Sequence, residues 1–408
     1  MAMLAAAAFN TASAAPWDDE SVVFDGLHYT IDSVNNTATC TYAILPRIRT
    51  GVCKRAPYTH DYYYSEPYYE KSENYEHLGA LVVPDSVDKF EVDKIGFYAF
   101  HNSGITSVTI GKNVKTLDEG AFICNDQLAS IKWGAALTNI NPMAFYGCKA
   151  LTKVSLPDAV KKAEFACFGG CDNLTEFSTG NGLESVSSGM FELCGNLSTL
   201  NIGNSVRDID PSAFWGCEAL HDINIAPSNK HFTFTDGLLI NNDSKSLIFF
   251  TTGKDTCSIP DGIEKVENGA LCFNDDIRSL TIPASVTYFG YNSVAENDNL
   301  TAIHCKAATP AKIEEKVNVF HNVTDHCTLY VPAGAVESYR AAPVWKDFKE
   351  IKEEVASGIT DIAVSGIGTN TDRNVYAPDG RIVRQNATSL EGLGKGIYIY
   401  QGQKHIVK

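Results

Sequence analysis

The fold is decided by the stretch Ala144-Phe-Tyr-Gly-Cys-Lys-Ala-Leu-Thr-Lys-Val-Ser-Leu-Pro157. The same pattern returns along the chain at steps of 23 residues. Its phenylalanine forms a column at nearly the same step, made of Phe100, Phe122, Phe145, Phe168, Phe191 and Phe214. A leucine column and a valine/leucine column keep the same period, and composition alone does not produce three columns in one phase. The sequence therefore predicts a solenoid of stacked turns.

One turn shows the physics of the repeat. Val154 and Leu156 are apolar and alternate with Lys153 and Ser155, as expected for a strand with one buried face. Pro157 cannot donate a hydrogen bond to a neighbouring strand, so it ends the strand. No single turn can bury its apolar face alone, and stacking supplies the missing partner.

These motifs resemble the BspA-like leucine-rich repeats of bacterial surface proteins, over roughly residues 80–350. The resemblance implies a β-rich leucine-rich-repeat solenoid with 23-residue repeats. It also implies an extracellular, cell-surface protein associated with adhesion to host matrix proteins or to other bacterial cells.

The chain divides into five segments. Residues 1–15 read as the remnant of a signal peptide, because a short apolar run precedes an Ala-x-Ala site. Residues 16–80 predict an N-terminal β cap with a Tyr-rich loop, and residues 81–352 the solenoid. Residues 353–358 are a linker to a small all-β C-terminal domain, residues 359–408.

The C-terminal segment predicts two β-hairpins, the first around a Pro-Asp-Gly turn. It resembles the C-terminal β-domains of proteins exported by Bacteroidetes-type anaerobes. That resemblance implies outer-membrane export or surface attachment. The alternative is a small β module with no sorting role.

One repeat departs from the pattern, because Ile225 and Ile259 are 34 residues apart instead of 23. The insert, residues 226–258, predicts a β-hairpin formed by residues 235–240 and 246–250. Insertions in repeats often carry the binding face, whereas the simpler interpretation is a hairpin decorating the solenoid flank.

Composition excludes several functions. The formal net charge of −16 disfavours nucleic acid as a partner, and no transmembrane segment of roughly 20 apolar residues is present. We find no catalytic constellation, metal-ligand spacing or cofactor motif, so we expect no enzyme, metal or cofactor. His321 and His326 lack a second ligand pair.

The 12 cysteines are better explained by the repeat than by disulfides. Cys148, Cys171, Cys194 and Cys217 form one column, and thiols in a column pack as small buried hydrophobic groups. Only Cys40 and Cys53, which precede the regular array, are candidates for a disulfide bond, and a free state stays open for them.

Two regions are candidate binding surfaces. The first is the Tyr-rich loop with Tyr62, Tyr63, Tyr64, Tyr68 and Tyr69, since tyrosine is a favoured contact residue, although these rings could also fold onto the array. The second is the outward face of the strands, with Lys132, Lys153, Glu176, Asn201 and Asp222.

Three functional hypotheses remain open. The first is a non-enzymatic surface adhesin or interaction scaffold whose partner is a host matrix or cell-surface protein. The second is a glycan-capture protein of a nutrient-uptake system, which requires a line of stacking aromatic rings. The third is a self-associating structural surface protein.

Overall fold

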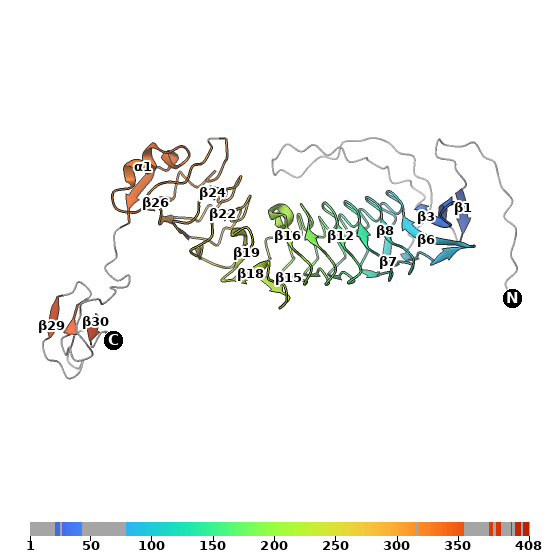
Figure 1. Ribbon diagram of the computed structural model, residues 1–408, viewed down its shortest axis with the longest axis horizontal. Coiled ribbons are helices and arrows are strands. Elements are labelled where there is room, and N and C mark those ends of the chain that lie inside the picture. Colours follow the sequence, from blue (N-terminus) through green and yellow to red (C-terminus); the bar gives the residue numbers. More distant parts are fainter. Residues whose placement is uncertain are drawn as a thin grey trace.

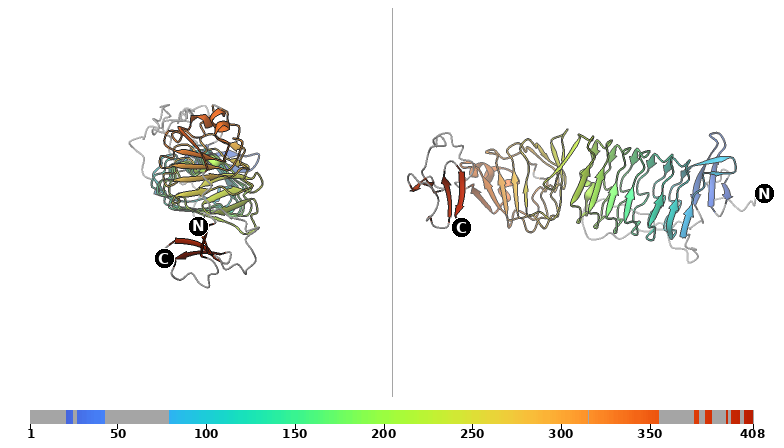
Figure 2. Two further views of the ribbon diagram at one scale, coloured as in Figure 1. Left: turned by 90° about the vertical axis from the view of Figure 1, so that its left-hand side faces the viewer. Right: turned by 90° about the horizontal axis from the view of Figure 1, so that it is seen from below.

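The computed structural model describes residues 21–24, 27–42, 79–314, 316–354, 375–377, 381–384, 393, 396–400 and 403–407. Short parallel strands stack turn upon turn along the long axis of the molecule (Figures 1 and 2). The predicted β-rich leucine-rich-repeat solenoid with 23-residue repeats is confirmed, because successive turns pair residues that are 23 apart, such as Val154 with Phe177.

Antiparallel strands lie at the N-terminal end of the solenoid. They are β1 (Ser21–Phe24), β2 (Leu27–Asp32) and β3 (Thr37–Tyr42). β3 then pairs in parallel with β6 (Phe90–Ile95), and β5 (Ser86–Val87) pairs antiparallel with β6. Asn36, with a φ of 56°, helps the chain turn from β2 into β3.

Each turn of the first half contributes one strand to each of two rows. The first row contains β4 (Gly79–Val82), β7 (Ile105–Thr109) and β9 (Ser130–Lys132), then β11 (Lys153–Ser155), β13 (Glu176–Ser178), β15 (Thr199–Ile202) and β17 (Asp222–Ile225). The second row contains β8 (Thr116–Leu117), β10 (Asn139–Ile140), β12 (Lys162–Ala163), β14 (Ser185–Val186) and β16 (Asp208–Ile209), followed by the 3-10 helix η1 (Pro211–Phe214).

The second half repeats this arrangement. Its first row is β21 (Thr256–Ser258), β23 (Ser279–Ile282), β25 (Ala302–Cys305), β26 (Thr328–Val331) and β27 (Glu350–Glu353). Its second row is β22 (Lys265–Val266) and β24 (Tyr288–Phe289). Helix α1 (Val336–Ala341) and the 3-10 helix η2 (Trp345–Asp347) close this end, where the buried Trp345 ring contacts Tyr339 and Phe348.

The C-terminal segment contains a four-stranded antiparallel sheet. Its strands are β28 (Val375–Tyr376), β29 (Ile382–Arg384), β30 (Gly396–Tyr400) and β31 (Gln403–Val407). β28 pairs with β29, and β30 pairs with β31, as the two predicted hairpins require. The small all-β C-terminal domain is thus part of the fold.

The insert contains the predicted hairpin and one further strand, so that it forms a three-stranded antiparallel meander. Its strands are β18 (Phe232–Thr235), β19 (Leu238–Asn241) and β20 (Ser246–Phe250), and β20 continues in parallel to β22. Asp236 and Gly237 both have a positive φ (50° and 85°), which produces the tight turn that splits residues 235–240. The sequence analysis missed this turn because it lies inside an apolar run.

The meander is not a decoration on the flank, because both of its faces are buried. The buried side chains of the solenoid form two hydrophobic cores. On one face of the meander, Phe232, Leu239 and Ile248 pack into the first core. On the other face, Leu238, Ile240, Leu247 and Phe250 pack into the second core. The insert therefore joins the two halves of the solenoid.

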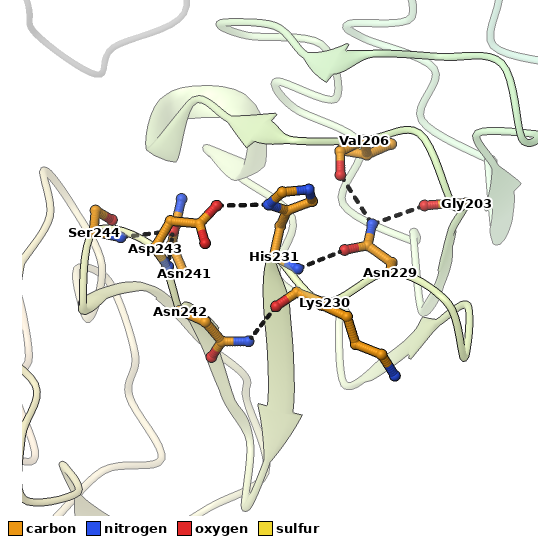
Figure 3. A network of polar contacts seen from close by, with 9 residues as sticks. All are labelled: Gly203, Val206, Asn229, Lys230, His231, Asn241, Asn242, Asp243 and Ser244. Atoms are coloured by element: carbon orange, nitrogen blue, oxygen red, sulfur yellow. Dashed lines mark hydrogen bonds and ion pairs between the residues drawn. The ribbon is translucent and has the colours of Figure 1, made fainter.

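Polar contacts fix the meander to the preceding turn (Figure 3). The buried Asn229 side chain donates hydrogen bonds to the carbonyls of Gly203 and Val206, both at 2.9 Å. Its amide oxygen accepts a bond from the His231 backbone N–H at 3.0 Å. His231 Nδ1 lies 2.6 Å from Asp243 Oδ2 in the β19–β20 turn. These bonds hold the start of β18 and the β19–β20 turn against the preceding turn of the solenoid.

The phenylalanine column is a stack of rings in the core. Phe122 lies 5.4 Å from Phe100 and 5.2 Å from Phe145, and Phe145 lies 5.3 Å from Phe168, all nearly parallel. Further along, Phe177 of β13 contacts Phe168 edge-on. Aromatic contacts of this kind stabilise beyond the area that they bury.

The cysteine column satisfies backbone carbonyls between turns. Cys148, Cys171, Cys194 and Cys217 donate their thiol protons to the carbonyls of Phe122, Phe145, Phe168 and Phe191, at 3.2–3.4 Å. In the preceding turn Asn125 takes this position and donates to the carbonyls of Phe100 and Phe122. The four thiols are free and buried, so the column is structural.

Phe145→Ala is expected to destabilise the first half by about 3–5 kcal/mol, because it removes a buried ring from the centre of the stack. Urea unfolding followed by circular dichroism measures this loss. Ser155→Ala, on the exposed face of β11, is the control and is expected to change stability by less than about 0.5 kcal/mol. Equal stability of the two variants would show that the stacked rings do not stabilise the first half.

Leu239→Ala and Leu247→Ala are each expected to destabilise by about 2–5 kcal/mol. Since the two side chains lie in different cores, hydrogen exchange should rise first in the first half for Leu239→Ala and in the second half for Leu247→Ala. Thr235→Ala, at an exposed position of β18, is the control. If Leu239→Ala and Leu247→Ala both showed the hydrogen-exchange pattern of Thr235→Ala, the insert would not join the two cores.

The thiol column predicts a dependence on alkaline pH. Burial raises the pKa of Cys148 and Cys217 far above the ordinary value of 9.0. The stability that these neutral thiols provide is complete below pH 9 and is lost as the pH rises above it, because unfolded thiols then ionise. The free energy of unfolding should fall by up to about 1.4 kcal/mol per pH unit per thiol.

The measurement compares urea unfolding of the natural chain and of the Cys148→Ala/Cys217→Ala double variant between about pH 8 and about pH 10.5. The double variant should show the shallower pH dependence. At neutral pH, Ellman's reagent should leave the four thiols of the column unmodified until the chain unfolds. Rapid reaction of these thiols in the folded protein would argue against their burial.

Candidate functional site

The strand face, defined as the outward face of β11, β13, β15 and β17, is a continuous polar surface. Lys153 Nζ lies 2.8 Å from Glu176 Oε2, and this cation lowers the pKa of the Glu176 carboxyl. Asn201 donates to Glu176 Oε1 at 3.4 Å and to Ser178 Oγ at 3.0 Å. Asn224 donates to Asn201 Oδ1 at 3.1 Å. Side-chain contacts thus connect all four turns.

The repeat places the predicted residues in two columns. Lys153, Glu176 and Asp222 occupy one column, which Thr199 completes in β15. Asn201 belongs to the second column, with Ser155, Ser178 and Asn224. Lys132 ends β9, where it pairs with Thr109, and it is exposed. The structure therefore brings Lys153, Glu176 and Asn201 into contact, and it keeps Asp222 and Lys132 on the same row of strands.

The other predicted contact residues lie outside the described residues. They are Tyr62, Tyr63, Tyr64, Tyr68 and Tyr69 of the Tyr-rich loop. Cys53 lies outside the described residues as well, whereas Cys40 is a buried free thiol whose pKa burial raises to about 12. A disulfide between Cys40 and Cys53 therefore stays a prediction.

Sequence reasoning missed a ring pair on the outward face of the second half. His304 of β25 and Tyr330 of β26 stack with centroids 4.9 Å apart and planes 9° apart. Glu354 follows β27, and its carboxylate lies 2.9 Å from His304 Nδ1. Nearby, Lys352 Nζ lies 2.6 Å from Glu350 Oε2. Because the turn that contains Tyr330 is not 23 residues long, the simple period did not predict this stack.

A second missed feature lies at the corner that follows the phenylalanine column. Gly147, Gly170 and Gly216 have positive φ there, as the sharp corner requires. Leu193 and Phe273 adopt the same conformation, with φ of 63° and 57°. A side chain in this left-handed conformation costs roughly 1–2 kcal/mol. Asn102, Cys124, Glu296 and Asn322 also have positive φ at this corner, so the sequence gives no single residue type that marks it.

The chemistry of the described residues agrees with a surface rather than a pocket. No three His, Cys, Asp or Glu side chains in the described ranges are grouped so that they could hold a metal ion. His321 Nδ1 lies 2.8 Å from Glu296, and His326 Nε2 lies 3.3 Å from the Asn297 carbonyl. Within the same ranges, no helix is both long enough and apolar enough to cross a membrane.

Comparison with solved structures shows the same kind of solenoid. A leucine-rich cell surface protein from Faecalibacterium prausnitzii A2-165 is 19% identical, with a TM-score of 0.51 over 84% of this chain and 97% of that chain. A leucine-rich repeat protein from Bacteroides ovatus ATCC 8483 is 17% identical, with a TM-score of 0.48 over 81% and 90% of the two chains. The pneumococcal vaccine antigen PcpA is 14% identical, with a TM-score of 0.47 over 82% and 99%. At 19% identity, the likeness to the Faecalibacterium prausnitzii protein shows the fold alone.

No curated protein sequence matches the chain. The family described as "BspA type Leucine rich repeat region" matches residues 93–221 and 243–337 in six copies. These residues make up more than half of the chain. The interruption between the two matched ranges falls at β17 and at β18 and β19 of the meander, where the period of the repeat breaks. The chain therefore belongs to the family of BspA-type leucine-rich-repeat proteins.

Proposed function

We propose that this chain is a non-enzymatic extracellular binding protein, a cell-surface adhesin or interaction scaffold that recognises a host matrix protein or other cells. The strand face carries the proposal, because Lys153, Glu176, Asn201 and Asn224 form one linked polar surface over four parallel strands. The strands hold these side chains in fixed register, so a partner meets a preorganised surface and binding costs little conformational entropy.

The family supports this proposal at a coarser level. Surface proteins with BspA-type repeats generally act through protein interaction and not through catalysis. The strand face also fits protein recognition, since extended solenoid surfaces commonly make many separate contacts with one partner. The formal net charge of −16 disfavours nucleic acid as that partner.

The cellular location belongs to the same proposal. Proteins with these repeats are bacterial surface proteins, and we place this chain at the outer membrane. The support for that placement is the resemblance of residues 359–408 to export and attachment domains. Residues 1–15, interpreted as the remnant of a signal peptide, lie outside the described residues.

One observation favours glycan capture as a second candidate function. The stacked rings of His304 and Tyr330 lie beside the Glu354 carboxylate on an outward face. Aromatic rings next to a few polar groups are common in ligand sites. The pair supplies only two rings, however, whereas a glycan chain needs a longer line, so protein recognition remains the first candidate.

Lys132→Glu together with Asp222→Lys is expected to weaken binding to the recognised matrix protein at least tenfold, or about 1.4 kcal/mol, because it reverses one charge on the strand face and one on β9 of the same row. The measurement is binding of the full chain to immobilised fibronectin, fibrinogen, laminin, mucin and plant glycans, at low and moderate salt. Thermal stability should stay nearly unchanged, since Lys132 and Asp222 are exposed.

The matched control is Lys162→Glu with Asp208→Lys, which makes the same charge changes at exposed positions of the second row. Loss of binding in both variants would show that recognition does not depend on the first row of strands in particular. Binding to glycans alone, reduced by Tyr330→Ala, would favour glycan capture. If the chain bound no member of the panel, and its sedimentation coefficient rose with protein concentration, the self-associating structural protein would be favoured.

A further inference from the structure

The outward face of the second half carries one column of side chains whose size changes along the row. Strand pairing aligns one residue of each strand in the first row, in the order Ser258, Thr281, His304, Tyr330 and Lys352. The column therefore begins with two short hydroxyl side chains, continues with two rings and ends with a lysine. The boundary between short and large side chains falls between Thr281 and His304, and we call these two residues the ring step.

The two rings follow the spacing of their strands. Their centroids are 4.9 Å apart and their planes differ by 9°, and neighbouring strands of a sheet are about 4.7–4.9 Å apart. Each ring thus belongs to one strand, and the stack runs along the row. One face of the His304 ring contacts Tyr330, so the opposite face is directed along the row toward Thr281.

Hydrogen bonds fix the His304 ring in this orientation. Its Nδ1 lies 2.9 Å and 3.2 Å from the two carboxylate oxygens of Glu354. Because an ionised carboxylate only accepts hydrogen bonds, Nδ1 carries the hydrogen. Glu354 is itself held by its backbone N–H, which donates to the Val331 carbonyl at 2.7 Å. The His304 side chain is still 25% exposed, so it forms a preorganised wall beside a shorter side chain.

The two ends of the ring stack differ. Next to Tyr330 the column continues with Lys352, whose ammonium lies 2.6 Å from Glu350 Oε2. A charged and paired side chain therefore occupies that end. At the other end Thr281 is half-buried and Ser258 is exposed, and the column contains no charge there. Only the Thr281 end of the column thus offers a ring face to another molecule.

We infer that the ring step binds an aromatic side chain of a partner protein, which lies above Thr281 and extends the stack of His304 and Tyr330 by one ring. Stacked aromatic rings attract each other beyond the area that they bury, and tyrosine and tryptophan are frequent anchors of protein interfaces. The hydroxyl groups of Thr281 and Ser258 supply hydrogen-bond partners for a phenol O–H or an indole N–H. The inference rests on the proposed function, protein recognition, and assigns one contact of that recognition.

The size and charge of the ring step decide the class of partner. One open ring face bordered by short side chains matches a single side chain, whereas a glycan chain needs a longer line of rings. A nucleic-acid base would also stack on a ring, but the formal net charge of −16 disfavours the phosphates that accompany it. An aromatic side chain brings one ring and no charge.

The probes are N-acetyltryptophanamide and N-acetyltyrosinamide, which carry one ring and no charge. Saturation-transfer NMR with the full chain measures their dissociation constants, and N-acetylleucinamide and methyl glucoside are the comparison probes. Thr281→Phe is the test variant, because its own ring fills the position of the added ring. Ser155→Phe is the matched control, since it places the same ring on the exposed face of β11, beside Ser178 and not beside a ring.

The natural chain should bind both aromatic amides more tightly than the leucine amide. Thr281→Phe should weaken the binding of both aromatic amides at least about fivefold, the factor expected for the loss of one ring contact. Ser155→Phe should bind them as the natural chain does. The melting temperature of Thr281→Phe should stay equal or rise, because the substitution lies on the outward face. If it falls, His304→Ala decides, since removal of the wall should weaken binding to the same extent.

Three results would overturn the inference. The first is equal binding of the aromatic amides by the natural chain, Thr281→Phe and His304→Ala. The second is binding of the leucine amide as tight as that of the aromatic amides. The third is binding of methyl glucoside alone, which would assign the ring pair to glycan capture. Because these probes do not include the matrix proteins, failure here leaves the strand-face proposal standing, and failure of that proposal does not change this result.

Discussion

The structure depends on one constraint: a turn of this chain cannot bury its own apolar face, so each turn needs the next one in the same register. Hydrogen bonds between adjacent turns enforce this register. Asn173 and Asn196 donate to the carbonyls of Lys149 and Asp172, and the thiol of Cys171 reaches the Phe145 carbonyl. An insertion of a single residue would displace all of these partners together, and this explains why the period of 23 is kept from Phe122 to Phe214.

The same constraint explains the meander. A longer insert between two regular turns would leave the last turn of the first half and the first turn of the second half without neighbours. The meander solves this by alternating its side chains, with Leu239 directed into one core and Leu238 and Ile240 into the other. A strand that is buried on both faces in this way reads as a continuous apolar run. Its base is held by the Asn229 hydrogen bonds (Figure 3).

The sequence predicted the features that follow the period. These include the register, the stacked phenylalanines, the buried thiols and the outward position of Lys153, because a period of 23 aligns them without further information. It did not predict contacts that cross the period. Glu354 meets His304 from 50 residues away, and the Trp215 indole reaches Gly269 across the insert. The turn at Asp236 and Gly237 was hidden by the apolar residues around it. Such contacts depend on the path of the chain in three dimensions.

A repeat also makes selection for stability visible inside one chain. At the corner after the phenylalanine column, φ is positive and nearly constant from turn to turn, although Asn102, Cys124, Leu193, Phe273, Glu296 and Asn322 stand there as well as Gly147, Gly170 and Gly216. Gly216 satisfies the corner at no steric cost, whereas Leu193 accepts strain and remains half exposed. By contrast, the change from Asn125 to Cys148 keeps the equivalent acceptor, the phenylalanine carbonyl of the preceding turn (Phe100 for Asn125 and Phe122 for Cys148), and is explained by the fold alone. In this solenoid the contacts between turns therefore hold a backbone conformation that several side chains adopt against their own steric preference.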